Sequence, residues 1–366
     1  MKIVFMNDGT YAYASGLPSA VGGSERDQWL LGISLANMGW SVKVGVRYGL
    51  ELGDRKFING VEFVGIGQGQ VLFAWYRFLA SERPHWWYWE CATHLWGPAV
   101  EIARLVGVRT IFALGFDREV EPRYALFERP HWWPLYAWGL SRTDRILAQH
   151  EGQLSKLSPG LRSKASVLPK VCVVPGMIGD TTTVKSHYDR RKYVAWVAML
   201  RQHKRPDILV EIARRMPDVR FVVCGGPTPF MTPPGYTERI VSELGMQPNV
   251  EFLGQVAPEK AQEIISDAAM LLSTSDVEGF PNTFVQAWSS GTPVVSLNVD
   301  PDGIIQRVGL GALSGSVEQA IRDITDLLES PWRRDEIATR ARQFVVEKYS
   351  ASAVVSLFER ALTGIH

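Results

Sequence analysis

Residues 270–297 read MLLSTSDVEGFPNTFVQAWSSGTPVVSL, and the order of apolar and polar residues in this segment indicates the class of fold. The segments 270–273 and 293–297 are short and apolar, which is typical of strands covered by helices on both faces. Between them, a polar loop containing Gly279 leads into a helical pattern over 282–290. A strand, a helix and a second strand in this order form a βαβ unit, which predicts a parallel sheet.

The same alternation extends on both sides of this segment. In the second half, strands are expected at 193–198, 219–224 and 250–253, and helices at 206–216, 236–244 and 259–269. In the first half, strands are expected at 3–6, 42–46, 61–64, 110–114, 144–148 and 166–174, and helices at 24–38 and 97–106. This repetition predicts an α/β fold of two Rossmann-like βα domains that face each other across a central cleft.

The boundary between the two domains is expected in the segment 175–192, which has few apolar residues and is interpreted as a linker. The predicted domains are 1–180 and 190–346. A helix over 351–362, within a C-terminal segment of 347–366, is a candidate to cross back to the first domain.

Composition narrows the classes of function. The chain has 366 residues, 46% of them hydrophobic, and its net charge of +1 does not favour nucleic-acid binding. Its three cysteines lie far apart and its histidines form no metal-binding pair, so no disulfide framework, metal site or cofactor is expected. Without an evident signal peptide or an apolar run of about 20 residues, the chain is expected to be cytoplasmic.

Tryptophan is concentrated in the first half, where 10 of the 13 residues lie before residue 140. One interpretation is packing in the core and between helices. The other is a surface that contacts an acceptor substrate or a membrane. Tryptophan favours the headgroup region of a bilayer. The second interpretation would place the chain peripherally at the inner face of the membrane.

Glycines follow two of the expected strands in the first half. Gly22 and Gly23 precede the helix at 24–38, where glycine allows close approach of a ligand and the helix N-terminus offers free N–H groups to a phosphate or sugar. The alternative is an ordinary turn before a helix. The alternating glycines in the segment 65–69 open no clear helix and are interpreted as a loop. Neither pattern is the dinucleotide-binding GxGxxG.

A cationic cluster, RQHKRP at 201–206, lies between an expected strand and helix of the second half. Arg201 and Lys204 at the carboxyl end of a strand would neutralise a diphosphate leaving group. The alternative is a solvated basic turn. A second junction of the same kind carries Glu278, whose carboxylate can hold hydroxyl groups, and Gln286 lies eight residues further on, inside the next helix.

Together these motifs resemble the retaining glycosyltransferases of family 4, which have the GT-B fold. The matching strings are GGSE at 22–25, LRQHKRPD at 200–207 and EGFPNTFVQAWSSGTPVVSL at 278–297, with CATHLWGPAVEIARLVGVRTIF at 91–112 resembling some bacterial members. The resemblance implies metal-independent, hexosyltransferase-type transfer from a nucleotide diphosphate sugar to a sugar, lipid-linked or small hydroxyl acceptor. It also implies retention at the anomeric carbon and a role in polysaccharide or glycolipid synthesis.

The resemblance further implies that 1–180 is the acceptor-side domain and that 190–346 binds the nucleotide sugar. It also implies roles for individual residues. Gly22 and Gly23 would contact the donor phosphate or the acceptor, and Lys204 would bind the diphosphate. Glu278 would contact the hydroxyls of the donor sugar, as the first acid of the E-x7-E motif does. Three backbone amides would lie near the sugar and phosphate: those of Gly279, Phe280 and Asn282.

The sequence departs from the family pattern at three places. Gln286 stands where the second acid of the motif holds the nucleotide ribose, so an uncharged amide would make these hydrogen bonds. Met199 stands where the family has an arginine, and Arg201 is expected to substitute. In the first domain a family histidine is missing, and Asp117 or His94 is the candidate for its role.

Two rival functions remain open on the sequence alone. One is a nucleotide-sugar epimerase of the same architecture, and the other is a catalytically weak nucleotide-sugar-binding subunit, which the departures at Gln286 and Met199 favour. Asp300-Pro301-Asp302 has the DxD spacing of a metal-binding motif. Because it follows the last strand of a second βα domain, it is interpreted as a loop beside the site.

Overall fold

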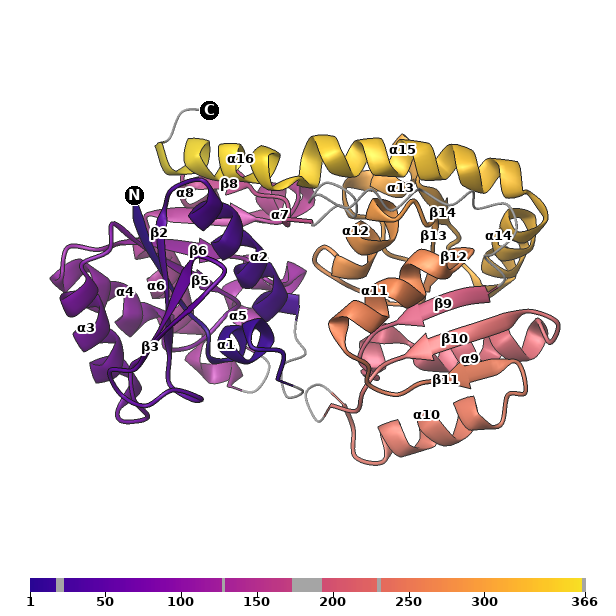
Figure 1. Ribbon diagram of the computed structural model, residues 1–366, viewed down its shortest axis with the longest axis horizontal. Helices are drawn as coiled ribbons and strands as arrows, with labels where there is room; N and C mark the ends of the chain where they lie inside the picture. Colours follow the sequence, from indigo (N-terminus) through magenta and orange to yellow (C-terminus); the bar gives the residue numbers. More distant parts are fainter. Residues whose placement is uncertain (18–22, 127–128, 173–192, 229–231, 364–366) are drawn as a thin grey trace. The chain divides into compact units, whose positions relative to one another are not determined.

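A computed structural model describes residues 1–17, 23–126, 129–172, 193–228 and 232–363. The chain divides into two compact units, which are Met1–Val171 with Ala351–His366, and Cys172–Ser350. Each unit is a sheet flanked by helices (Figure 1). The linker expected at 175–192 lies outside the described residues. No helix among the described residues is long and apolar enough to cross a membrane.

Unit 1 is built on an eight-stranded sheet in the order β3-β4-β2-β1-β5-β6-β7-β8, in which only the β3–β4 pair is antiparallel. The strands are β1 (Lys2–Met6), β2 (Ser41–Val46), β3 (Arg55–Ile58), β4 (Val61–Gly65), β5 (Trp86–Glu90), β6 (Arg109–Ala113), β7 (Arg145–Ala148) and β8 (Ala165–Val167). The helices are α1 (Asp8–Ala14), α2 (Gly23–Asn37), α3 (Val71–Glu82), α4 (Trp96–Leu105), α5 (Pro122–Ala125), α6 (Trp133–Arg142), α7 (Glu151–Lys156), α8 (Pro159–Arg162) and α16 (Ala351–Thr363), with 3-10 turns η1 (Asp117–Val120) and η2 (Pro130–Trp132).

Unit 2 has a six-stranded, all-parallel sheet in the order β11-β10-β9-β12-β13-β14. The strands are β9 (Tyr193–Val197), β10 (Arg220–Cys224), β11 (Val250–Phe252), β12 (Met270–Ser273), β13 (Val294–Ser296) and β14 (Gly311–Leu313). The helices are α9 (Pro206–Arg215), α10 (Tyr236–Gly245), α11 (Pro258–Asp267), α12 (Asn282–Ser289), α13 (Ile304–Val308), α14 (Val317–Glu329) and α15 (Pro331–Tyr349), with 3-10 turns η3 (Gln202–Lys204) and η4 (Pro301–Gly303).

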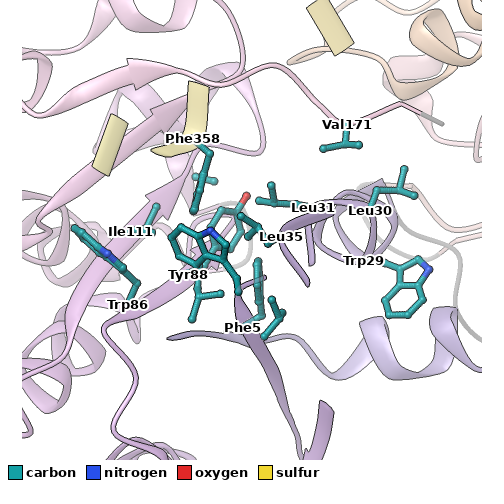
Figure 2. Close-up of a cluster of buried hydrophobic side chains, with 14 of the residues drawn as sticks. Phe5, Trp29, Leu30, Leu31, Leu35, Trp86, Tyr88, Ile111, Val171 and Phe358 are labelled. Carbon is teal, nitrogen blue, oxygen red and sulfur yellow. The ribbon is translucent and has the colours of Figure 1, made fainter. Parts of the chain in front are cut away.

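Both faces of the first sheet are covered, as its apolar strands require. In β1, Ile3 and Phe5 belong to one buried cluster, whereas Val4 and Met6 belong to another. Phe358 of α16 packs into the first cluster together with Phe5 (Figure 2). The C-terminal helix is therefore part of the core of unit 1.

The tryptophans of unit 1 mostly serve as core residues. Trp86, Trp87 and Trp96 are buried, and Trp87 and Trp96 form an edge-to-face pair with ring centroids 5.7 Å apart. Trp132 and Trp138 are instead 42% exposed. Core packing therefore accounts for the run in β5, while these two side chains form part of the surface.

The structure corrects several expected elements. Residues 8–14, expected in a loop, form α1, which is capped by Asn7 because its Oδ1 accepts a hydrogen bond of 2.9 Å from the N–H of Gly9. The expected strand at 166–174 is shorter and ends at Val167. The expectation that no helix follows the glycines of 65–69 is wrong, because α3 begins at Val71.

Candidate active site

The candidate site of unit 2 lies at the carboxyl ends of two neighbouring strands. β9 and β12 pair in parallel, although two other strands lie between them in the sequence. The loops that leave them therefore start at the same edge of the sheet. These loops carry the cationic cluster at 201–206 and the acidic segment at 274–281.

An ion pair between Lys204 and Glu278 joins the two loops. Their side chains are only 19% and 11% exposed, so the opposite charges face each other in a partly desolvated place. Thr274 fixes this geometry, since its hydroxyl donates to the carbonyl of Lys204 over 2.7 Å and accepts from Trp196 Nε1 over 2.9 Å. The structure thus brings together two residues that the sequence predicts for the site.

The neighbouring cations have different surroundings. Arg201 is half-buried just before η3, and its N–H donates to the carbonyl of Met199 over 2.7 Å. Arg205 is paired with Asp207, with Nη2 and Oδ2 2.9 Å apart, and with Asp276, with Nη1 and Oδ1 3.2 Å apart. Arg205 therefore acts as a bridge between the loops. Arg201 and Lys204 stay the predicted phosphate-binding residues.

His203 lies between these cations and is uncharged at neutral pH. Burial, followed by the positive charge of Lys204, lowers the pKa of its imidazole to about 4. Its carbonyl accepts a hydrogen bond of 2.9 Å from the N–H of Asp276. The positive charge of the cluster at neutral pH therefore comes from its arginines and lysine.

The helix α12 begins immediately after the acidic loop. Pro281 occupies its N-cap position and provides no side-chain cap, so the N–H groups of the first turn are directed toward the loop. The side chain of Phe280 is buried against Trp288 and Tyr349, with ring centroids 6.4 and 5.7 Å away. Since Gly279 is also buried, these residues can serve a ligand only through their backbone.

Gln286 lies within α12 and is half-buried. Its carbonyl accepts a hydrogen bond of 3.1 Å from Gln262 Nε2, while its own side-chain amide bonds to none of the described residues. The position is compatible with a ligand-binding amide, and the role of Gln286 toward a ribose stays a prediction.

The sequence also predicts site residues in unit 1, and each of them is described by its contacts inside that unit. Gly22 lies outside the described residues, and Gly23 is the exposed first residue of α2. Asp117 lies in η1, where its Oδ1 is 2.9 Å from His150 Nε2 and accepts from Gln153 Nε2 over 3.0 Å. His94, the alternative candidate, lies 3.2 Å from Arg129 through Nε2.

Two polar residues of unit 1, His150 and Glu119, lie near the candidate residues but were not predicted from the sequence. His150 follows strand β7 and contacts Asp117, and its position after a strand was the available signal. Glu119 is buried and accepts hydrogen bonds from the N–H groups of Gly115 and Ala92 over 2.8 and 3.0 Å. Burial raises the pKa of Glu119 to about 7 despite these bonds.

The DxD string is part of a helix cap. Asp300 accepts hydrogen bonds from the N–H groups of Ile305 and Gln306, over 2.7 and 3.2 Å, at the start of α13. Both carboxylate oxygens are thus engaged by backbone. Across the described ranges, no group of three His, Cys, Asp or Glu side chains could hold a metal ion.

Comparisons with known proteins bear on both units. Residues 180–344 match the family model described as Glycosyl transferases group 1. A D-inositol 3-phosphate glycosyltransferase of Mycolicibacterium smegmatis is 28% identical over 253 residues, which are 63% of this chain and 57% of the relative. Another of that name, from Mycobacterium sp. (strain KMS), is 34% identical over 34% of this chain and 29% of the relative. The matches thus span less than two thirds of these curated relatives.

Solved structures resemble the whole chain. Anabaena Alr3699/HepE in complex with UDP and glucose has a TM-score of 0.73 at 14% identity, and sucrose-phosphate synthase from Thermosynechococcus elongatus has 0.74 at 15%. Both comparisons cover 100% of each chain. These likenesses confirm the predicted α/β fold of two Rossmann-like domains. The chain therefore has the GT-B fold, and residues 180–344 match the glycosyl transferases group 1 model.

Proposed function

We propose that this chain is a retaining, family 4 type glycosyltransferase that moves a sugar, of the hexose type, from a nucleotide diphosphate sugar to a hydroxyl acceptor. The observation that carries the proposal is the ion pair between Lys204 and Glu278 at the shared edge of β9 and β12. It places a cation for phosphate beside a carboxylate for sugar hydroxyls. The UDP bound in the Anabaena neighbour and the group 1 domain match support the same donor class.

The residues of unit 2 would act by position and charge. Lys204 and Arg201 would stabilise the negative charge that develops on the departing diphosphate. Glu278 would orient the sugar by accepting hydrogen bonds from its hydroxyls. Retention then follows from attack on the face that the diphosphate leaves, with the diphosphate itself taking the proton of the acceptor hydroxyl. No metal ion enters this scheme, because side-chain cations perform the neutralisation.

The acceptor is proposed to be a sugar, a lipid-linked sugar or a small hydroxyl compound, in the synthesis of a polysaccharide or glycolipid. The curated relatives are named for transfer to D-inositol 3-phosphate, which supports a polyhydroxylated acceptor. A cytoplasmic chain with peripheral contact at the inner face of the membrane would fit a lipid-linked acceptor. The exposed side chains of Trp132 and Trp138 are the candidates for such contact.

Nucleotide binding by the Arg201→Ala variant tests the donor proposal. We expect the variant to lose about 1.5–3 kcal/mol of affinity for UDP, because a charge-assisted hydrogen bond to phosphate is lost, and to bind uridine as the wild type does. Isothermal titration calorimetry with both ligands measures the difference. Arg220→Ala is the matched control, since Arg220 begins β10 at the opposite end of the same sheet and is exposed. Equal losses for UDP and uridine would refute the phosphate assignment.

A second candidate function is a nucleotide-sugar-binding subunit with weak activity, which the amide at Gln286 favours. If Gln286 holds the ribose, Gln286→Glu should change UDP affinity by about 1 kcal/mol, since a carboxylate binds hydroxyls more strongly but is repelled by the diphosphate. Gln286→Leu should bind UDP least well, because the ribose hydroxyls lose their partner. Calorimetry on the three proteins decides: identical affinities would place Gln286 outside the nucleotide site.

A further inference from the structure

Unit 1 contains two adjoining cavities at the carboxyl edge of its sheet, both lined by Arg47 and Ile66. The inner cavity, of about 360 Å³, lies at the ends of β1, β2 and β5. The outer cavity, of about 400 Å³, lies between the end of β4 and the start of α3. All of their lining residues belong to unit 1, and the two cavities meet at the shared residues Arg47 and Ile66.

The inner cavity combines aromatic and acidic side chains. Trp75 and Trp89 form part of its wall, with ring centroids 5.1 Å apart. Asp8 and Glu90 supply carboxyl groups to its lining. A sugar ring offers an apolar C–H face to an indole and hydroxyl groups to a carboxylate, so this cavity suits an uncharged saccharide ring.

The outer cavity is positively charged. Arg47 and Arg77 line it, and neither guanidinium forms an ion pair with a carboxylate in the described part of the chain. Each lies over an aromatic ring instead, with Cζ of Arg77 5.9 Å from the Phe73 centroid and Cζ of Arg47 5.4 Å from that of Tyr48. Two arginines outnumber the single lining carboxylate, that of Glu51. The cavity therefore favours an anion, and a guanidinium matches phosphate in geometry.

The backbone around the outer cavity adds to this preference. The segment 67–70 lines the cavity and leads directly into α3, a helix of 12 residues. Gln70 at the N-cap makes no side-chain hydrogen bond to the helix, so the first N–H groups of α3 are not capped by it. Gly67 has φ of +83°, which glycine adopts without strain.

We propose that the two cavities bind one acceptor, a saccharide that carries a phosphoryl group. The sugar ring occupies the inner cavity between Trp89 and the carboxylates, and the phosphoryl group lies in the outer cavity beside Arg47 and Arg77. The role of acceptor rests on the proposed glycosyl transfer. The phosphoryl group belongs either to a free sugar phosphate or to a lipid-linked sugar, and the exposed side chains of Leu52 and Phe73 border the cavity where a lipid would continue.

Binding of glucose 1-phosphate tests the phosphoryl site. Calorimetry is performed in saturating UDP, so that the phosphate-binding residues of unit 2 are occupied. We expect the wild type to bind glucose 1-phosphate at least tenfold more tightly than glucose, and the double variant Arg47→Gln/Arg77→Gln to lose this preference. Arg104→Gln, an exposed arginine in α4 outside both cavities, is the control and should keep it. Equal affinity for the two ligands, or an unaffected double variant, overturns the proposal.

Transfer assays then separate the two sources of phosphate. UDP-glucose is offered with glucose, with glucose 1-phosphate and with a prenyl diphosphate-linked sugar, and products are separated by chromatography. We expect kcat/KM to be at least tenfold higher for a phosphorylated acceptor than for glucose. Phe73→Ala should lower kcat/KM only for the lipid-linked acceptor. Phe57→Ala, at another exposed phenylalanine, on β3, is the control and should leave it unchanged.

The two proposals fail in different ways. A chain that binds glucose 1-phosphate through Arg47 and Arg77 but binds no nucleotide would overturn the glycosyltransferase proposal and leave the phosphoryl site standing. A chain that binds UDP and transfers glucose to unphosphorylated acceptors with equal or higher kcat/KM would overturn the phosphoryl site alone.

Discussion

Glu278→Gln should lower the rate of glycosyl transfer by about 100-fold or more while leaving the fold intact. Glutamine keeps the size of the side chain but removes the charge that holds Lys204 and would hold the hydroxyls of the donor sugar. The loss concerns an interaction with the reacting sugar, so it should fall mainly on kcat. The measurement is UDP release from UDP-glucose, with the melting temperature recorded alongside.

Two further variants make this result interpretable. Glu278→Ala should be at least as inactive and also less stable, because Lys204 then keeps a partly buried charge without its partner. Glu251→Gln, at an exposed carboxylate of β11 that pairs with Arg220, is the control and should retain activity. Near wild-type turnover by Glu278→Gln would show that the ion pair has only a structural role.

The βα pattern of unit 2 was predictable because each element has its own local signal. The strand at 270–273 and the helix from 282 lie where the alternation of apolar segments and the Gly–Pro loop predict them. The contact between Lys204 and Glu278 could not follow from spacing, since 74 residues separate them. It depends on the sheet order, in which the chain passes through β10 and β11 before β12 returns to pair with β9.

Unit 1 was less predictable because its signals are atypical. Strand β5 reads WWYWE, with four aromatic residues and none of the β-branched residues that mark most of the other strands. Helix α3 follows a glycine-rich loop and has no Ser, Thr, Asp or Asn at its N-cap, so its start carries no capping signal. Helix α1 is only seven residues long, and a helix of this length is set by its cap and its packing rather than by periodicity.

The sequence does not distinguish Asp117 from His94 as the residue that replaces the family histidine. Both follow strands of unit 1, and a spacing argument treats them alike. The structure distinguishes them by their surroundings, since Asp117 is held by His150 and Gln153, whereas His94 is beside Arg129 and Trp132. Burial, followed by the positive charge of Arg129, lowers the pKa of His94 below its usual value. Which of them contacts a substrate remains a prediction.

Trp96→Ala should destabilise unit 1 by about 3–5 kcal/mol, because a fully buried indole leaves a cavity that its neighbours cannot fill. The ring packs against Trp87 and Phe112, with centroids 5.7 and 5.2 Å away, and its Nε1 donates to Thr143 Oγ1 over 2.9 Å. Chemical denaturation with urea, followed by tryptophan fluorescence, measures the change in the free energy of unfolding.

Two further variants separate the contribution of packing to stability from that of the hydrogen bond and from the effect of removing a surface indole. Trp96→Phe keeps an aromatic ring but leaves the hydroxyl of Thr143 without this donor, so it should cost less than alanine does, about 1–3 kcal/mol. Trp138→Ala removes the same side chain at a position that is 42% exposed and should change stability by less than 1 kcal/mol, on the order of other surface substitutions. If Trp96→Ala and Trp138→Ala had equal effects, the tryptophans of unit 1 would not be acting as core residues. The alternative interpretation, in which these tryptophans form a binding surface, would then be favoured.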